Sequence, residues 1–268
     1  MIAVSSIAAA GTRRRLHSLG NGTGYWKTSY FDGEGGDTPP GEKPVIDPER
    51  LHPMALLVEQ DPSSELQAHF HEADQFQVVV AGDGTIGREQ VGQIALHYAS
   101  AYTTYGPILA GAGGLSYFTL RNGFEFKAWH MPESREHLSL ARRRPPRFGM
   151  GRFDFAEVMQ AAPAAGSVRE RAVMPMAPDG LAAWLYVAGA GAMVAGHDPL
   201  LGRGQHWLVL SGSFADGPLQ GGPKLSCGFL RPDEAALRAR AGAEGVVALV
   251  MQYPLHDALD SQAPGAHS

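Results

Sequence analysis

Two histidines and a glutamine in the segment HFHEADQF, at 69–76, have the types and spacing of a metal site. Residues two apart on a β-strand project from the same face, so His69 and His71 can present both imidazoles to one space. A tight turn at 72–74 then brings Gln75 beside them at the start of the next strand. Neutral imidazoles ligate transition metals, and a weak amide ligand leaves coordination positions open. The segment therefore predicts a site for Mn, Fe, Ni, Cu or Zn held by His69, His71 and Gln75.

Polar residues on the neighbouring strands extend this candidate site. Gln77 shares a strand face with Gln75, which fits a polar pocket better than a dry core. Arg121 ends the strand expected at 115–121. If its face is luminal, it can clamp a substrate carboxylate, and otherwise it is an ordinary exposed arginine. Gln77 and Arg121 are thus candidate substrate-binding residues.

Two tyrosines lie near the expected mouth of this pocket. Tyr102 and Tyr105 flank a pair of threonines, and Tyr102 is a candidate substrate-binding residue. Tyr105 is a candidate general acid or hydrogen-bond donor to a developing oxyanion. Alternatively, the Tyr105-Gly106-Pro107 sequence simply forms a turn with the aromatic ring packed on the proline.

The elements that must position these residues are short strands separated by turns. The 268-residue chain has 34 Gly and 19 Pro and only 18% charged residues, which disfavours a helical bundle. A basic, proline-containing stretch at 141–152 indicates a boundary, and a short helix is expected at 153–162. Strands are expected at 55–60, 75–80, 93–98, 115–121, 182–187, 206–210, 224–230 and 245–251.

The two halves of the chain resemble each other. With Gly82 placed over Gly212, an offset of 130, the segment 75–82 aligns with 205–212. At an offset of 131, the strand 115–121 aligns with 246–252. Two strand-and-turn features in the same order and at nearly the same separation predict a duplicated β-domain.

The spacing HxHxxxQ, followed after six residues by Gly82, resembles the first conserved motif of the cupin superfamily. The resemblance implies an all-β fold with two double-stranded β-helix (cupin, or jelly-roll) barrels joined by a short helix, that is, a bicupin. It also implies a metal held by His69, His71 and Gln75 near the mouth of the first barrel. Cupins of this kind commonly pair, so a homodimer is expected.

The chain departs from the cupin pattern in two places. The second cupin motif usually supplies a fourth ligand, a histidine, and none stands at that position here. Tyr105, His97 or water is left to complete the site, and His97 and Tyr105 are the candidate catalytic residues. In the second half, His69 and His71 correspond to Pro199 and Leu201, so the second barrel is expected to be degenerate and metal-free.

These observations divide the chain into five expected parts. They are an N-terminal arm, partly disordered; a first barrel with the metal site; a linker with a short helix; a degenerate second barrel; and a loose tail. Their bounds are 1–45, 46–135, 136–180, 181–256 and 257–268.

Composition excludes several classes of protein. A formal charge of −5 and a pI near 6.1 argue against general nucleic-acid binding. No apolar run reaches the roughly 18 residues that a spanning helix needs, so no membrane association is expected. The single cysteine, Cys227, forms no internal disulfide, which favours a reducing, cytoplasmic location. The arginines at 13–15 follow an apolar start and loosely suggest a transit peptide. The alternative interpretation is a disordered leader or an overlong translation start.

Two functions from different classes remain open. In the first, the protein is a metal-dependent enzyme acting on a small organic molecule, of dioxygenase, isomerase or lyase type. In the second, it is a small-molecule-binding cupin with no metal, whose histidines only hydrogen-bond the ligand. The intact HxHxxxQ motif favours the first, and the missing fourth histidine favours the second.

Overall fold

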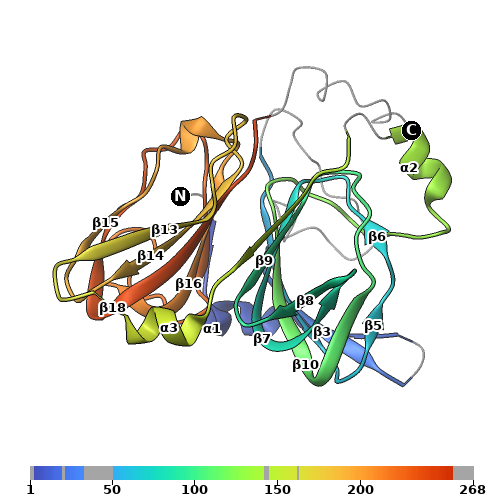
Figure 1. Ribbon diagram of the computed structural model, residues 1–268, viewed down its shortest axis with the longest axis horizontal. Coiled ribbons are helices and arrows are strands. Elements are labelled where there is room, and N and C mark those ends of the chain that lie inside the picture. Colours follow the sequence, from blue (N-terminus) through green and yellow to red (C-terminus); the bar gives the residue numbers. More distant parts are fainter. Residues whose placement is uncertain (1–2, 20–21, 33–50, 142–144, 162, 256–268) are drawn as a thin grey trace.

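The computed structural model describes residues 3–19, 22–32, 51–141, 145–161 and 163–255. These residues form two β-sheet halves that lie face to face (Figure 1). The all-β fold with two barrels, predicted above, is confirmed. None of the described helices is long and apolar enough to cross a membrane. The arginine cluster at 142–144 and the tail at 257–268 lie outside the described residues.

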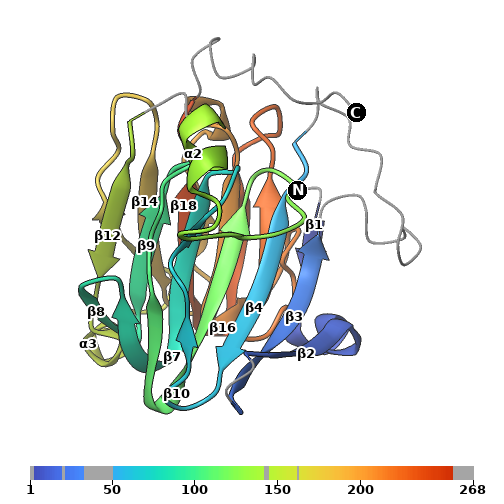
Figure 2. The same cartoon turned by 90° about the vertical axis from the view of Figure 1, so that its right-hand side faces the viewer.

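The first half, called barrel 1 below, is a nine-stranded antiparallel sheet within the described residues. Its strand order is β12-β9-β7-β10-β4-β3-β2, with β5 paired to β10 and β8 to β7. A small sheet of β6 and β11 lies beside it (Figure 2 shows the broad sheet face-on). The strands are β2 (Arg14–Ser18), β3 (Gly24–Asp32), β4 (Met54–Gln60), β5 (Glu65–Leu66), β6 (His69–Phe70), β7 (Gln75–Ile86), β8 (Glu89–Gly92), β9 (Ala95–Ala99), β10 (Ile108–Arg121), β11 (Trp129–His130) and β12 (Phe148–Arg152).

The second half, called barrel 2, is a seven-stranded sheet in the order β1-β17-β16-β18-β14-β13, with β15 paired to β18. Its strands are β1 (Ala3–Ser5), β13 (Val168–Met174), β14 (Ala182–Ala188), β15 (Met193–Ala195), β16 (Gln205–Phe214), β17 (Cys227–Leu230) and β18 (Arg238–Gln252). The helical elements are α1 (Ile7–Ala10), η1 (Gly11–Arg13), α2 (Arg135–Ala141), α3 (Phe155–Gln160) and η2 (Pro199–Leu201). The helix expected at 153–162 is thus α3, which Asp154 caps by accepting hydrogen bonds from two backbone N–H groups.

The segments expected to be an arm and a linker contribute strands to both sheets, which corrects those two expectations. Strand β1 pairs with β17 of barrel 2, whereas β3 pairs with β4 of barrel 1. In the expected linker, β12 pairs with β9 and β13 pairs with β14. Segment 24–32 forms strand β3 because its side chains alternate between two different environments. Thr28 and Tyr30 are buried on one face, and Lys27 and Ser29 line a cavity on the other. Residues 33–45 of the expected arm lie outside the described residues.

The largest apolar core lies between the two sheets. Barrel 1 contributes Phe76 and Val78 of β7, and barrel 2 contributes Leu208 and Leu210 of β16. All four side chains are almost fully buried. Since strand residues alternate between faces, the neighbours of these residues must point into the interior of their own barrel.

The predicted duplication is visible in the backbone. In barrel 1, β7 carries a one-residue bulge at Val80 in its pairing with β10, and in barrel 2, β16 carries one at Leu210. Just beyond each bulge stands a glycine with positive φ, +74° at Gly82 and +68° at Gly212. A Cβ on either one would lie 2.1 Å from a carbonyl oxygen of the facing strand. The two halves therefore share one strand-bulge-turn design at the offset of 130 read from the sequence.

The interiors of the two barrels are filled differently. In barrel 1, Leu56 and Gln77 both lie opposite Thr119 of β10, and Val58 lies opposite Tyr117. In barrel 2, the three corresponding positions face Val250 and Ala248 of β18 and hold large aromatic residues. These are Trp184, Tyr186 and Trp207. At these three positions barrel 2 therefore carries larger side chains than barrel 1, and they fill its interior.

We expect Gly82→Ala and Gly212→Ala each to lower the free energy of unfolding by at least about 2 kcal/mol. The added methyl group meets the facing backbone, and alanine is disfavoured at positive φ. Urea denaturation followed by circular dichroism measures the loss. Gly92→Ala is the matched control, since its Cβ would meet nothing within 4 Å, and it should leave stability nearly unchanged. Equal stability of all three variants would contradict the close approach described here.

We also expect stability to fall as the pH is lowered from 6.5 toward 3, in part because of His206. This histidine stacks on Phe31 in the core between the sheets, and its Nδ1 lies 3.0 Å from the hydroxyl of Tyr253. Burial lowers the pKa of His206 from 6.5 to about 3. Between these values the unfolded chain binds a proton that the folded chain does not, so folding loses up to about 1.4 kcal/mol per pH unit. Urea midpoints measured from pH 7.5 to 4.5 should fall less steeply in His206→Gln, and identical slopes would refute this assignment.

Candidate functional site

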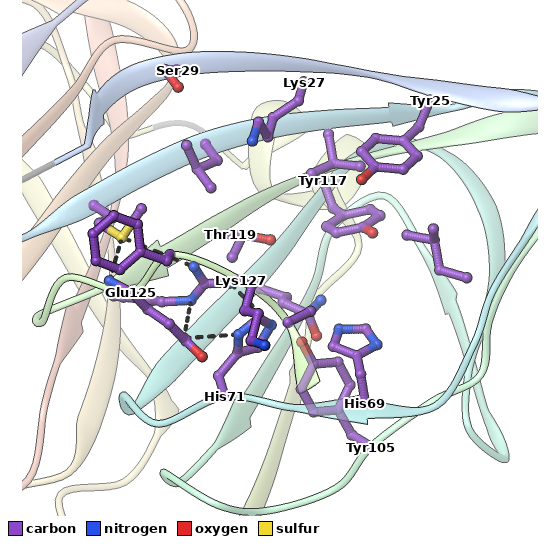
Figure 3. A pocket seen from close by; sticks show the side chains of 18 of the residues that line it. Tyr25, Lys27, Ser29, His69, His71, Tyr105, Tyr117, Thr119, Glu125 and Lys127 are labelled. Carbon is purple, nitrogen blue, oxygen red and sulfur yellow. Dashed lines mark hydrogen bonds and ion pairs between the residues drawn. The ribbon is translucent and has the colours of Figure 1, made fainter. Parts of the chain in front are cut away.

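A cavity of about 310 Å³ opens in the interior of barrel 1 (Figure 3). Its walls come from β3, β4, β7 and β10 of the large sheet and from β6 and the segment 124–130 that includes β11. The lining residues combine an apolar wall with converging polar groups. They are Tyr25, Lys27, Ser29, Met54, Leu56, Val58, Leu66, His69, His71, Gln77, Tyr105, Tyr117, Thr119, Arg121, Phe124, Glu125, Phe126, Lys127, Ala128 and His130.

The two histidines of the HxH segment both face this cavity, as the two-residue spacing predicts. Their ring centroids are 5.2 Å apart and the rings are nearly perpendicular. Phe70 between them points the other way and packs near Trp129 and Tyr102. The alternation of a short strand thus separates a polar face from an aromatic one.

Each of these histidines has its outer ring nitrogen occupied. Nδ1 of His69 lies 2.7 Å from the carbonyl oxygen of Gln67, and Nδ1 of His71 lies 2.8 Å from a carboxylate oxygen of Glu125. The acceptors on these Nδ1 atoms place the proton there and leave Nε2 with its lone pair. Burial lowers the pKa of His69 to about 3, and burial and then Arg121 lower that of His71. Both imidazoles are therefore neutral at pH 7.

Arg121 occupies the centre of the polar cluster. Its β10 position pairs directly with Gln75 of β7, so both side chains point into the barrel, and only 6% of Arg121 is exposed. Its Nε donates to Oε1 of Gln75 at 2.9 Å, and its Nη2 lies 3.0 Å from Nε2 of His71. The luminal alternative for Arg121 is thus the one observed, and its guanidinium engages two of the predicted metal ligands.

The remaining predicted residues form a second layer of hydrogen bonds. Nε2 of Gln75 donates to the hydroxyl of Tyr105 at 2.6 Å, and Nδ1 of His97 lies 2.9 Å from Oε1 of Gln77. Tyr105 and Gln77 line the cavity, whereas Gln75 and His97 are buried and do not reach its surface. Burial lowers the pKa of His97 to about 4 and raises that of Tyr105. Tyr105 is therefore a neutral donor or acceptor at pH 7.

Tyr102 does not belong to this cluster, and its role as a substrate-binding residue stays a prediction. It lies on the aromatic side of the HxH segment, with its ring centroid 6.1 Å from that of Phe70 and 6.5 Å from that of His137. Its backbone, at φ +57°, donates to the carbonyl oxygen of His71. This turn sends Tyr102 and Tyr105 to opposite sides of the segment.

Four cavity residues with an acidic or basic side chain are absent from the sequence-based selection: Lys27, Glu125, Lys127 and His130. Glu125 accepts from Nδ1 of His71 and, at 3.1 Å, from the backbone N–H of Glu72. Burial raises the pKa of Glu125 to about 7. Lys127 lies 3.9 Å above the ring of Trp129. The sequence signal for this part of the site is the segment FEFKAWH at 124–130. Its aromatic and polar residues alternate, which is more typical of an edge strand than of a loop.

In this arrangement the donors do not fit a resident divalent cation. Transition-metal ligands must converge to within about 2–2.5 Å of one point through free lone pairs. Here the lone pair of His71 Nε2 and the oxygen of Gln75 both accept hydrogen bonds from the positively charged Arg121. Within the described part of the chain, no three His, Cys, Asp or Glu side chains are placed to hold a metal ion. Metal ligation by His69, His71 and Gln75 stays a prediction.

Sequence comparison finds no match among protein-family models or among curated proteins. Solved structures do match. One is the formate complex of Lactobacillus farciminis oxalate decarboxylase, with a TM-score of 0.56 and 14% identity, covering 96% of this chain and 88% of that one. Another is the nickel(II) complex of the Escherichia coli pirin YhhW, with a TM-score of 0.54 and 14% identity, covering 96% and 100% of the two chains.

A Bacillus subtilis oxalate decarboxylase variant gives a TM-score of 0.53 and 12% identity, covering 96% of this chain and 79% of that one. Oxalate decarboxylase and pirin are both proteins of the cupin superfamily. At this identity the likeness concerns the fold, and the predicted resemblance is confirmed at that level: the chain has the cupin fold.

Proposed function

We propose that this protein binds a small organic molecule inside barrel 1, as a cupin that needs no resident metal for binding. The observation that carries the proposal is the cavity of about 310 Å³ in barrel 1, at positions that barrel 2 fills with aromatic side chains. Ligand pockets span about 300–1,000 Å³ and combine an apolar lining with a few polar groups, so this cavity suits a small molecule.

The lining supports binding of a partly apolar ligand. Leu56, Val58 and Tyr117 form an apolar wall, and His69 and Arg121 stand among the polar groups that can orient the molecule. In barrel 2, the residues corresponding to Leu56 and Val58 are Trp184 and Tyr186, which occupy that volume with side chains. Keeping the barrel 1 positions small leaves apolar surface uncovered, which has a cost in stability that ligand binding offsets.

One observation favours the metal-dependent enzyme as a second candidate function. His69 and His71 each use Nδ1 on an outer acceptor and turn Nε2 inward, which is how histidines that ligate metals are usually held. A dioxygenase, isomerase or lyase of this kind would require Arg121 to leave its hydrogen bonds to His71 and Gln75. The elemental analysis described below decides between the two candidates.

We expect the double variant Leu56→Trp/Val58→Tyr, which copies barrel 2, to lose small-molecule binding while remaining folded. The larger side chains fill the cavity and exclude a ligand. Saturation-transfer NMR with a library of neutral and charged fragments identifies molecules bound by the wild type, and the same spectra of the variant show which are lost.

Leu16→Trp, at a side chain that is 59% exposed, is the matched control and should keep every signal. A circular dichroism melt confirms that the double variant is folded. Fragments that bind equally well to the folded double variant, or a wild type that binds none, would overturn the proposed function.

A further inference from the structure

We infer that the guanidinium of Arg121 takes the place of a metal cation in barrel 1 and recognises the carboxylate of the ligand. This inference rests on the function proposed above and names the chemical class of the molecule bound.

The positive charge of Arg121 lies beside two of the metal ligands that the motif predicts. Arg121 directs its Nε toward Oε1 of Gln75 and its Nη2 toward Nε2 of His71, the inward-facing donors that the HxHxxxQ motif offers to a cation. A positive group already satisfies these two ligands. A divalent cation bound at the same atoms would have to displace both hydrogen bonds and stand against the guanidinium charge.

Arg121 also keeps hydrogen-bond donors for a ligand. A guanidinium carries five N–H groups. Gln75 and His71 engage two of them, and the Met54 sulfur, 4.0 Å from Nη1, lies near a third. Two donors therefore remain on a side chain that lines the cavity, and a carboxylate can accept them.

The protein itself compensates the charge of Arg121 only in part. The nearest carboxylate, that of Glu125, lies 3.7 Å from Nε of Arg121, beyond good hydrogen-bond distance, and it accepts from His71 instead. A buried guanidinium is incompletely compensated when its counterion lies at this distance and shares the same oxygen with His71. An anionic ligand in the cavity would supply a closer counterion.

The surroundings of the cavity also favour an anion. Its lining includes three basic side chains, Lys27, Arg121 and Lys127, and one acidic side chain, Glu125. The difference is 3 − 1 = +2 even with Glu125 ionised, in a chain whose formal charge is −5. Figure 3 shows Lys27 and Lys127 with His71 and Glu125 around the same space. An excess of positive charge in a low-dielectric cleft concentrates anions.

Barrel 2 provides an internal comparison. The residue at the position of Arg121 is Gln252, which accepts a hydrogen bond from Gln205 at 2.8 Å, as Gln75 and Arg121 are joined in barrel 1. The glutamine stands in the barrel filled by aromatic residues, and the arginine stands in the barrel with the cavity. The hydrogen-bonded pair in barrel 2 therefore forms without a charge, so this pairing does not in itself require an arginine.

The experiment compares carboxylates with amides of the same shape. Wild-type protein, purified without an affinity tag, is titrated by calorimetry with formate, acetate, malonate and benzoate, and with formamide, acetamide, malonamide and benzamide. We expect at least one carboxylate to bind and its amide to bind at least about tenfold more weakly, since hydrogen bonds to a charged group contribute more.

Arg121→Gln, which copies barrel 2, should weaken the carboxylate at least about tenfold, whereas Arg152→Gln should not. Arg152 is exposed and pairs with Glu89 on the surface, so it serves as the matched control. A melt of Arg121→Gln verifies its fold. Binding of none of the carboxylates, equal binding of acid and amide, or undiminished binding to folded Arg121→Gln would overturn the inference. Neutral fragments lost in Leu56→Trp/Val58→Tyr would still support the proposed function.

Elemental analysis tests the other half of the inference. The untagged wild type should contain far less than one equivalent of Mn, Fe, Ni, Cu or Zn. Equilibrium dialysis against Ni²⁺ should show stronger binding by Arg121→Gln than by the wild type, because Nε2 of His71 loses its cationic partner. Stoichiometric metal in the wild type that disappears in His69→Ala/His71→Ala would overturn the inference and establish the metal site. Unchanged Ni²⁺ binding in Arg121→Gln would likewise contradict it.

Discussion

The apolar core between the two sheets determines which residues can do chemistry in this molecule. Phe76 and Val78 must face that core, so Gln75 and Gln77 on the same strand must face the interior of barrel 1. A shift of one residue would bury two amides between the sheets and expose the aromatic ring to the cavity. The apolar packing between the two sheets therefore determines where the polar cluster lies, although the cluster is not part of that core.

The bulges at Val80 and Leu210 limit how far this alternation extends. Each bulge changes the parity of its strand, and the glycine beyond it allows two backbones to approach closely where the strand turns out of the sheet. The polar residues of barrel 1 lie on the regular side of the bulge, opposite β10. The same constraint acts in barrel 2, where it positions Trp207 in place of Gln77.

The sequence predicted what depends on local period and on repetition, and missed what depends on distant pairing. The facing of His69 and His71 followed from their spacing, and the duplication followed from Gly82 and Gly212, because positive φ and the close approach of the facing backbone favour glycine at both positions. The pairing of β1 with barrel 2 and of β3 with barrel 1 had no local signal, since strands 3–5 and 24–32 find partners far along the chain. For Arg121, the residue type indicated a carboxylate clamp, but the sequence did not show whether its side of the strand faces the barrel interior or solvent. Glu125 follows the strand, and only the fold brings it to His71.

The two barrels show how one scaffold can divide stability from binding. A filled interior contributes dispersion and burial, as Trp184 and Trp207 do in barrel 2, but it leaves no volume for a ligand. An open interior gives up that contribution, and its buried polar groups then need partners. In barrel 1 these partners are arranged as a chain from Glu125 through His71 to Arg121 and Gln75, which satisfies neutral imidazole and amide groups but leaves the guanidinium charge only partly balanced. In the function proposed above, this partly balanced guanidinium selects the ligand by its charge.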